Sequence, residues 1–222
     1  MRHFSVELGE LHELLLQMGA LVESSIRRSV QSLVERDKEL AKAVMRDEPR
    51  INQMQVEIDA KTTRLLALQQ PVAKDLRFLM ATLKINTDLE RMGDLAVNIA
   101  ERAIALSHLP PVKPLIDIPK MAALVQGMLL KSLDAFVKVD GDLAQSILPS
   151  DDEVDRLRDS AYQELVELMQ RDPVVVPAAV DLIFVARNLE RIADHATNIA
   201  EDVVFLAKGI DVRHHMADQP RA

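Results

Sequence analysis

The stretch LERMGDLAVNIAE, residues 89–101, returns almost unchanged as LERIADHATNIAE, residues 189–201. Nine of the thirteen paired positions are identical, far more than two unrelated helices would share. A shorter pair lies upstream, where DKELA at residues 37–41 returns as DGDLA at residues 140–144. Repetition of this kind indicates two copies of one supersecondary unit. We therefore expect the chain to fold as an internal duplication.

Each copy reads as three amphipathic helices, because apolar residues recur at spacings of three and four along almost the whole chain. Strand-like alternation of apolar and polar residues does not compete with this pattern. The apolar stripes predict six long helices, at about residues 4–44, 49–69, 73–106, 120–148, 151–168 and 182–208.

Breaks between these helices are predicted from turn and capping residues. Asp47-Glu48-Pro49 indicates the end of the first helix and the start of the second, since proline is accepted in a first helical turn. Ser150-Asp151-Asp152-Glu153 has the form of a capping box and predicts the start of the fifth helix. Lys208-Gly209 is a typical helix end.

Four prolines between Ser107 and Pro119 exclude a helix there and predict a linker between the copies. The expected fold class is all-α, with two tandem three-helix bundles at residues 1–108 and 120–210. The linker covers residues 109–119, and residues 211–222 are expected to be a flexible polar tail.

Composition excludes several classes of protein. Among 222 residues, 35 are acidic and 27 basic, and aromatic residues make up 3%, which argues against nucleic-acid binding. The absence of cysteine removes disulfides, thiolate zinc sites and cysteine nucleophiles, and fits a cytoplasmic protein. With six glycines in the chain, glycine-rich phosphate-binding loops are not expected. No run of 18 apolar residues, the length of a membrane-spanning helix, occurs in the sequence. We expect a soluble protein that does not itself enter the membrane.

The repeated helix carries carboxylates and an amide along one polar stripe. At about 100° per residue, Asp194 lies roughly 40° and Asn198 roughly 80° from Glu190. Glu90, Asp94 and Asn98 repeat this arrangement. Such a stripe is either a set of metal ligands or an ordinary solvated or salt-bridged face, and the residues alone leave both readings open. Like charges four residues apart are mildly unfavourable, which favours the ligand reading.

Antiparallel hairpins would bring more oxygen ligands to each stripe. Asp47, Glu48 and Asn52 would lie beside the first stripe. Asp151, Asp155 and Asp159 would lie beside the second. Clusters of oxygen ligands suit hard cations such as Mg²⁺, Ca²⁺, Mn²⁺ or iron better than Zn²⁺. The predicted metal ligands are Glu90, Asp94, Asn98, Asp151, Asp155, Glu190, Asp194 and Asn198.

Catalytic motifs are not apparent. No Glu-x-x-His box of the ferritin-like kind occurs, and no nucleophile is paired with a base. His195 lies off the acidic stripe and is expected to have a structural or interface role. We therefore expect a protein that is not an enzyme, with a helical metalloenzyme using a carboxylate cluster as the alternative.

The motifs closely resemble the paired signatures of the PhoU family. The resemblance is carried by residues 51–59, 70–77, 88–94 and 189–201, and it extends over about residues 3–210. It implies a fold of two three-helix bundles that are commonly dimeric. It also implies metal clusters bound through E/D-x-x-x-D motifs, here Glu90/Asp94 and Glu190/Asp194.

The same resemblance implies a function and its partners. The expected role is a cytoplasmic negative regulator of the Pho regulon that links the ATPase of the Pst phosphate transporter to the Pho sensor histidine kinase. Contact with the membrane would be indirect, through the transporter. Two differences between the copies, Asn52 against Asp155 and Leu95 against His195, imply that the two metal sites differ.

Overall fold

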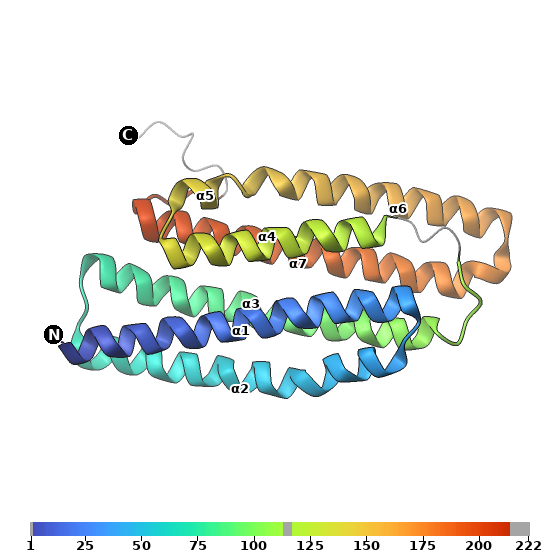
Figure 1. Cartoon of the computed structure of the whole chain (residues 1–222). Helices are drawn as coiled ribbons and strands as arrows, with labels where there is room; N and C mark the ends of the chain where they lie inside the picture. The colour runs from blue at the N-terminus through green and yellow to red at the C-terminus, as the bar shows by residue number, and fades with distance from the viewer. Residues whose placement is uncertain (1, 113–116, 214–222) are drawn as a thin grey trace.

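The computed structural model describes residues 2–112 and 117–213, and for residues 2 and 3 only the backbone. Its elements are α1 (Arg2–Glu35), α2 (Lys38–Gln69), α3 (Ala73–Leu106), α4 (Ile118–Lys138), α5 (Gly141–Gln145), α6 (Asp151–Arg171) and α7 (Val176–Lys208), with 3₁₀ turns at Leu148–Ser150 and Pro173–Val175. No strand occurs in these described ranges. Helices α1 to α3 form one bundle, and α4, α6 and α7 form the other, with α5 against α7 (Figure 1). The all-α, two-bundle prediction is confirmed.

Helices α3 and α7 lie at the centre of the molecule. Each packs against the other helices of its own bundle, and the contact between α3 and α7 is the most extensive between any two helices described. A second contact between the bundles joins α1 to α4, where a Cβ atom on Gly19 would lie 2.7 Å from Leu133 Cδ1. The two bundles therefore share one continuous apolar core.

The first helical break is not where the sequence placed it. Helix α1 ends at Glu35, Arg36 takes a left-handed φ of 57°, and Asp37 caps α2 by accepting hydrogen bonds from the backbone N–H groups of Glu39 (2.8 Å) and Leu40 (3.3 Å). Helix α2 then continues through Pro49. The prediction of a break at Asp47-Glu48-Pro49 is wrong, because the side-chain cap at Asp37 is the stronger local signal.

The fourth predicted helix, at residues 120–148, is also interrupted. Helix α4 ends at Lys138, and Asp140 caps the short α5 by accepting from the N–H groups of Asp142 (3.0 Å) and Leu143 (2.9 Å). Asp37 and Asp140 thus perform the same task in the two copies. The predicted capping box at Ser150 is wrong, since Ser150 has helical dihedrals and its side chain makes no cap hydrogen bond.

The linker predicted at 109–119 is partly described. Arg36 Nη2 donates to the carbonyl oxygens of Ser107 (3.0 Å) and Leu109 (2.6 Å), so the turn between α1 and α2 holds the start of the linker. Residues 113–116 of the linker and 214–222 of the predicted tail lie outside the described residues. Within the described chain, none of the helices has a stretch apolar enough and long enough to cross a membrane.

The two copies fill the same packing site in different ways. A Cβ atom on Gly93 of α3 would lie 3.1 Å from Cδ1 and 3.3 Å from Cγ2 of Ile51 on α2. The second copy has Ala193 in place of Gly93, and Val154 stands in place of Ile51 when the repeats are aligned from Asp37 and Asp140. A methyl group is gained on one helix and lost on the facing one, which keeps the packed volume nearly constant.

We expect Gly93→Ala and Ile51→Val to be coupled in a double-mutant cycle. The double variant should be more stable than the sum of the single variants by about 1 kcal/mol, because the methyl group removed from Ile51 makes room for the one added at residue 93. Chemical denaturation of the four proteins measures this coupling. Gly127→Ala combined with Ile51→Val is the control, since a Cβ atom on Gly127 meets nothing within 4 Å. Additive effects at Gly93 and Ile51 would contradict the packing account.

Candidate metal centre

Four carboxylates from α6 and α7 face one another in the second bundle. Asp151 and Asp155 lie in the first turns of α6, and Glu190 and Asp194 lie near the middle of α7. Burial raises the pKa of Asp151 to about 6, with further contributions from the charges of Asp194, Asp155 and Glu190. Burial and the neighbouring Glu190 and Asp155 carboxylates also raise the pKa of Asp194. The structure therefore brings these four predicted ligands within electrostatic reach of one another.

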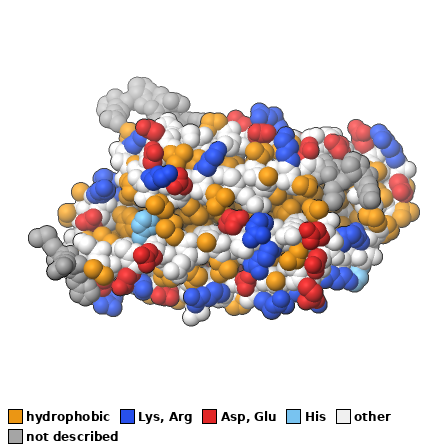
Figure 2. All heavy atoms as spheres, viewed as in Figure 1, with side chains coloured by type: hydrophobic (Ala, Val, Ile, Leu, Met, Phe, Trp, Pro, Cys, Tyr) orange, Lys and Arg blue, Asp and Glu red, His pale blue; other side chains and the backbone are white. Residues whose placement is uncertain are grey.

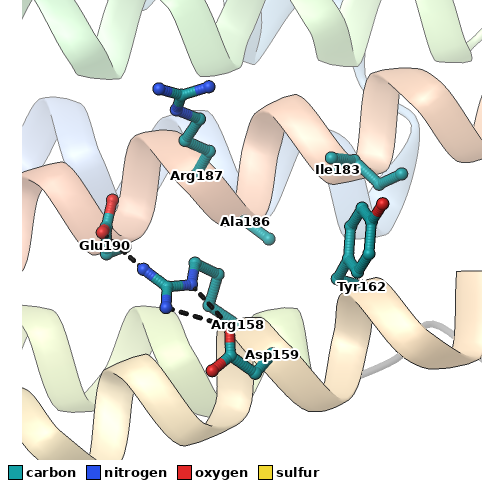
Figure 3. A pocket seen from close by; sticks show the side chains of 7 residues that line it. All are labelled: Arg158, Asp159, Tyr162, Ile183, Ala186, Arg187 and Glu190. Atoms are coloured by element: carbon teal, nitrogen blue, oxygen red, sulfur yellow. Dashed lines mark hydrogen bonds and ion pairs between the residues drawn. The ribbon is translucent and has the colours of Figure 1, made fainter.

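One guanidinium group neutralises part of this second cluster. Arg158 Nη1 donates to Glu190 Oε1 at 2.6 Å and lies 3.1 Å from Asp155 Oδ1. Its Nε and Nη2 atoms donate to Asp159 Oδ1 at 3.0 and 2.9 Å (Figure 3). Asp159 was expected beside the acidic stripe of α7. It accepts hydrogen bonds from the Arg158 guanidinium instead.

A pocket of about 350 Å³ opens beside this arginine. Figure 3 shows its lining residues from α6 and α7, with Arg187 pointing away from the Arg158 guanidinium. They are Arg158, Asp159, Tyr162, Ile183, Ala186, Arg187 and Glu190. Space is therefore available next to the salt-bridged carboxylates.

The first bundle holds a corresponding cluster between α2 and α3. Burial raises the pKa of Glu90, and so does the charge of Asp94. Burial likewise raises the pKa of Asp94, with a further contribution from Glu48. Asp47, expected at this stripe, is instead paired with Arg28 of α1. Glu48, Glu90 and Asp94 form the acidic part of the first cluster, and none of them is ion-paired with a described Lys or Arg side chain.

Each cluster contains a buried oxygen atom that has no hydrogen-bond partner. These atoms are Asn52 Oδ1 in the first bundle and Asp151 Oδ1 in the second. A buried acceptor without a donor is costly and usually has a specific explanation, such as an ion. With the repeats aligned as above, Asn52 corresponds to Asp155, Glu48 to Asp151 and Gln55 to Arg158. The unsatisfied oxygens and the hard carboxylate ligands around them fit a multivalent cation in both bundles.

Side chains of the described residues do not form a closed cage for a metal, as no group of three His, Cys, Asp or Glu converges tightly enough. Carboxylates without a cation between them repel one another, and in the second cluster Arg158 draws Glu190 and Asp155 toward itself. The fit to a metal therefore rests on the donor set and the unsatisfied oxygens.

The predicted asparagine ligands lie apart from this arrangement. Asn198 Nδ2 donates to Asp88 Oδ1 of α3 at 3.3 Å, and Asn98 is exposed to solvent. In the described structure neither asparagine is hydrogen-bonded to an acidic residue of the two clusters. Their helical position on the stripe was correct, but α3 and α7 also pack on each other, and Asn198 faces that contact.

His195 lies in the contact between the bundles. Its Nδ1 atom is 2.8 Å from Asp88 Oδ1, and both residues are buried. This placement agrees with the expected interface role. The sequence patterns predicted neither Asp88 as its partner nor Arg158 as a member of the second cluster. Arg158 could have been found, since it follows Asp155 by three residues on the same face of a helix.

Comparisons with known proteins agree with the duplication. The model of the PhoU domain matches twice, at residues 15–103 and 118–203. A phosphate-specific transport system accessory protein PhoU homolog of Pseudomonas aeruginosa is 41% identical over 214 residues, which are 96% of this chain and 88% of that protein. A homolog of the same name from Aquifex aeolicus is 41% identical over 208 residues, 94% of each chain.

Solved structures agree as well. The crystal structure of PhoU from Pseudomonas aeruginosa superposes with a TM-score of 0.90 at 40% identity, covering 93% of this chain and all of that one. The phosphate transport system regulatory protein PhoU from Streptococcus pneumoniae gives 0.87 at 32% identity, covering 94% and 99%. With both halves matched and nearly the full length of these relatives covered, the chain belongs to the PhoU family.

Proposed function

We propose that this protein is an accessory regulator of phosphate transport that acts through protein contacts. The observation that carries the proposal is the similarity over both bundles to proteins named phosphate-specific transport system accessory proteins. A matching structure from Streptococcus pneumoniae is described as a regulatory protein of the phosphate transport system. Those names describe accessory and regulatory proteins, which favours a role other than catalysis.

The partners we propose are the ATPase of the Pst transporter and the Pho sensor histidine kinase, with the protein as a cytoplasmic homodimer that represses the Pho regulon. Exposed aliphatic side chains at both hairpin tips support contacts with other proteins. These are Leu68, Val72 and Leu76 at the first tip and Val174, Val176 and Val180 at the second. On the face shown in Figure 2, basic and acidic side chains are interspersed, which does not favour a nucleic-acid surface there.

The second part of the proposal is that each bundle binds a multivalent cation of the hard class, which comprises iron, Mn²⁺, Mg²⁺ and Ca²⁺. Glu48, Asn52, Glu90 and Asp94 would hold it in the first bundle, and Asp151, Asp155, Glu190 and Asp194 in the second. A bound cation would cancel the repulsion among the carboxylates and satisfy the buried oxygens of Asn52 and Asp151.

A helical metalloenzyme remains the alternative, and metal-dependent hydrolysis of phosphoesters by the purified protein would favour it over the adaptor.

Deletion of the gene tests the regulatory role. We expect phosphate-starvation genes to remain switched on in high phosphate, because the signal from the transporter would no longer reach the kinase. Reporter expression at high and low phosphate, with complementation by the intact gene, measures this. Normal repression in the deletion strain would contradict the adaptor function.

Removal of metal tests the two clusters. In the wild type, saturating Mn²⁺ at a hundred times its Kd should add about 2.7 kcal/mol of stability per occupied site, seen as a higher Tm that chelator abolishes. Glu90→Ala with Asp94→Ala should lose the stabilisation by metal that comes from the first bundle. Glu190→Ala with Asp194→Ala should lose the stabilisation that comes from the second. Elemental analysis gives the metal content in parallel. If chelator leaves all three melting temperatures unchanged and no metal is found, the clusters are only charged surface.

Stability of the metal-free protein should depend on Asp151. The pKa of this carboxyl is raised to about 6 in the folded protein from 3.8, so its ionisation opposes folding at pH 7 and the penalty fades as the pH falls through 6 toward 4. In chelator, Asp151→Asn should raise the Tm at pH 7, by an amount equivalent to about 1 kcal/mol after solvent screening, and raise it less at pH 5. Asp75→Asn is the control, since Asp75 is exposed in the first turn of α3 and does not act on Asp151. A Tm lowered equally at both pH values would contradict the burial of an ionised Asp151.

A further inference from the structure

We propose that Arg158 competes with the metal at the second cluster, so that the two bundles bind metal with unequal affinity and fill in sequence, the first bundle before the second. The inference rests on the metal binding proposed above and assigns to Arg158 the role of setting the affinity of one site.

Arg158 occupies the oxygen atoms that a cation in the second bundle would need. Its Nη1 atom alone bridges the two helices, donating to Glu190 Oε1 on α7 and lying 3.1 Å from Asp155 Oδ1 on α6. The Glu190 side chain is only 18% exposed, so this pair is shielded from solvent more than an ordinary surface ion pair. A metal that takes Glu190 and Asp155 as ligands must displace the Nη1 contact, because one oxygen lone pair cannot serve both cations equally well.

The surroundings of Arg158 allow this displacement without loss of the whole side chain. Nε and Nη2 are held by Asp159, whose carboxylate is 71% exposed and lies outside the cluster. The pocket of about 350 Å³ on the same side gives the guanidinium a place to move. Arg158 is therefore tethered beside the cluster in a way that permits it to leave Glu190 and return.

The first bundle has no counterpart of this arginine. Gln55 stands at the corresponding position, and the register is supported by buried residues that precede it on the same helix. Ile51 and Met54 of α2 match Val154 and Leu157 of α6, and all four are buried. Glutamine cannot neutralise Glu90. Within the described ranges no Lys or Arg is ion-paired with an acidic residue of the first cluster, so a metal entering it has no tethered guanidinium to displace. This difference predicts tighter binding in the first bundle, even though Asn52 supplies one charge fewer than Asp155.

The test uses full-length proteins that keep one cluster each. Glu90→Ala with Asp94→Ala leaves the second cluster, and Glu190→Ala with Asp194→Ala leaves the first. Mn²⁺ is titrated into metal-free protein and the free ion is measured by electron paramagnetic resonance, which gives Kd without any activity assay. Circular dichroism checks that every variant keeps its helical content.

In the protein with only the second cluster, Arg158→Gln should tighten Mn²⁺ binding about tenfold, the scale expected for release of one shielded, charged hydrogen bond. Arg156→Gln is the matched control, because it removes the same charge from an exposed position of the same helix. Its Kd should change far less. In the protein with only the first cluster, Gln55→Arg should weaken binding by a similar factor, and it tests the idea independently if the Arg158 variant folds poorly.

The outcomes separate this inference from the proposal beneath it. Binding in both single-cluster proteins with no gain from Arg158→Gln, or an equal gain from Arg156→Gln, would overturn the competition by Arg158 and leave metal binding intact. If neither single-cluster protein binds Mn²⁺, the competition by Arg158 and the metal binding proposed above are both overturned. Weaker binding after Arg158→Gln would show that the arginine supports the site, which also contradicts the inference.

Discussion

The packing of α3 against α7 is the interaction on which the rest of the structure depends. These two helices carry more buried residues than any other helix of the described chain, and each contacts every other helix of its own bundle. The contact joins the two copies into one core, and it buries the pair of Asp88 and His195 between them. A buried acid and imidazole at hydrogen-bond distance fix the register of two helices that apolar packing alone would leave freer to slide.

Because α3 and α7 pack against the other helices of their bundles and against each other, their exposed polar residues are confined to one face of each helix. The repeated Glu-x-x-x-Asp motif lies on that face, on the side where α2 packs against α3 or α6 against α7. Carboxylates from the neighbouring helix therefore meet those of the central helix, and burial raises the pKa values of Glu90, Asp94, Asp151 and Asp194. A fold that concentrates like charges in this way is stabilised by a cation. In the second bundle Arg158 supplies part of that charge, whereas no described Lys or Arg side chain is ion-paired with Glu48, Glu90 or Asp94 in the first.

Much of this could be predicted from the sequence, since helical periodicity and an internal repeat are local signals that tertiary packing reinforces. The helix ends were harder to predict than the helices themselves. Asp37 and Asp140 both cap helices, and their pairing in the shorter repeat already contained that information, but the proline at residue 49 drew the break to the wrong place. Proline costs a helix one hydrogen bond, and the buried Val44 and Ile51 on either side of it hold α2 together.

The facing residues of each cluster followed from hairpin geometry. The pairing of Asp47 with Arg28, of Asn198 with Asp88 and of Glu190 with Arg158 depended on side-chain choices between helices that no single-helix pattern contains.

The central claim is that the duplicated carboxylate clusters are two cation sites of unequal strength. Crystals of the full-length protein grown in chelator and soaked in increasing Mn²⁺, with anomalous diffraction recorded at each step, test it most directly. We expect the first anomalous peak among Glu48, Glu90 and Asp94. At higher concentration a second peak should appear among Asp151, Glu190 and Asp194, with the Arg158 guanidinium moved off Glu190. Anomalous density at neither cluster in saturating Mn²⁺, or at the second cluster first with Arg158 still on Glu190, would contradict the account.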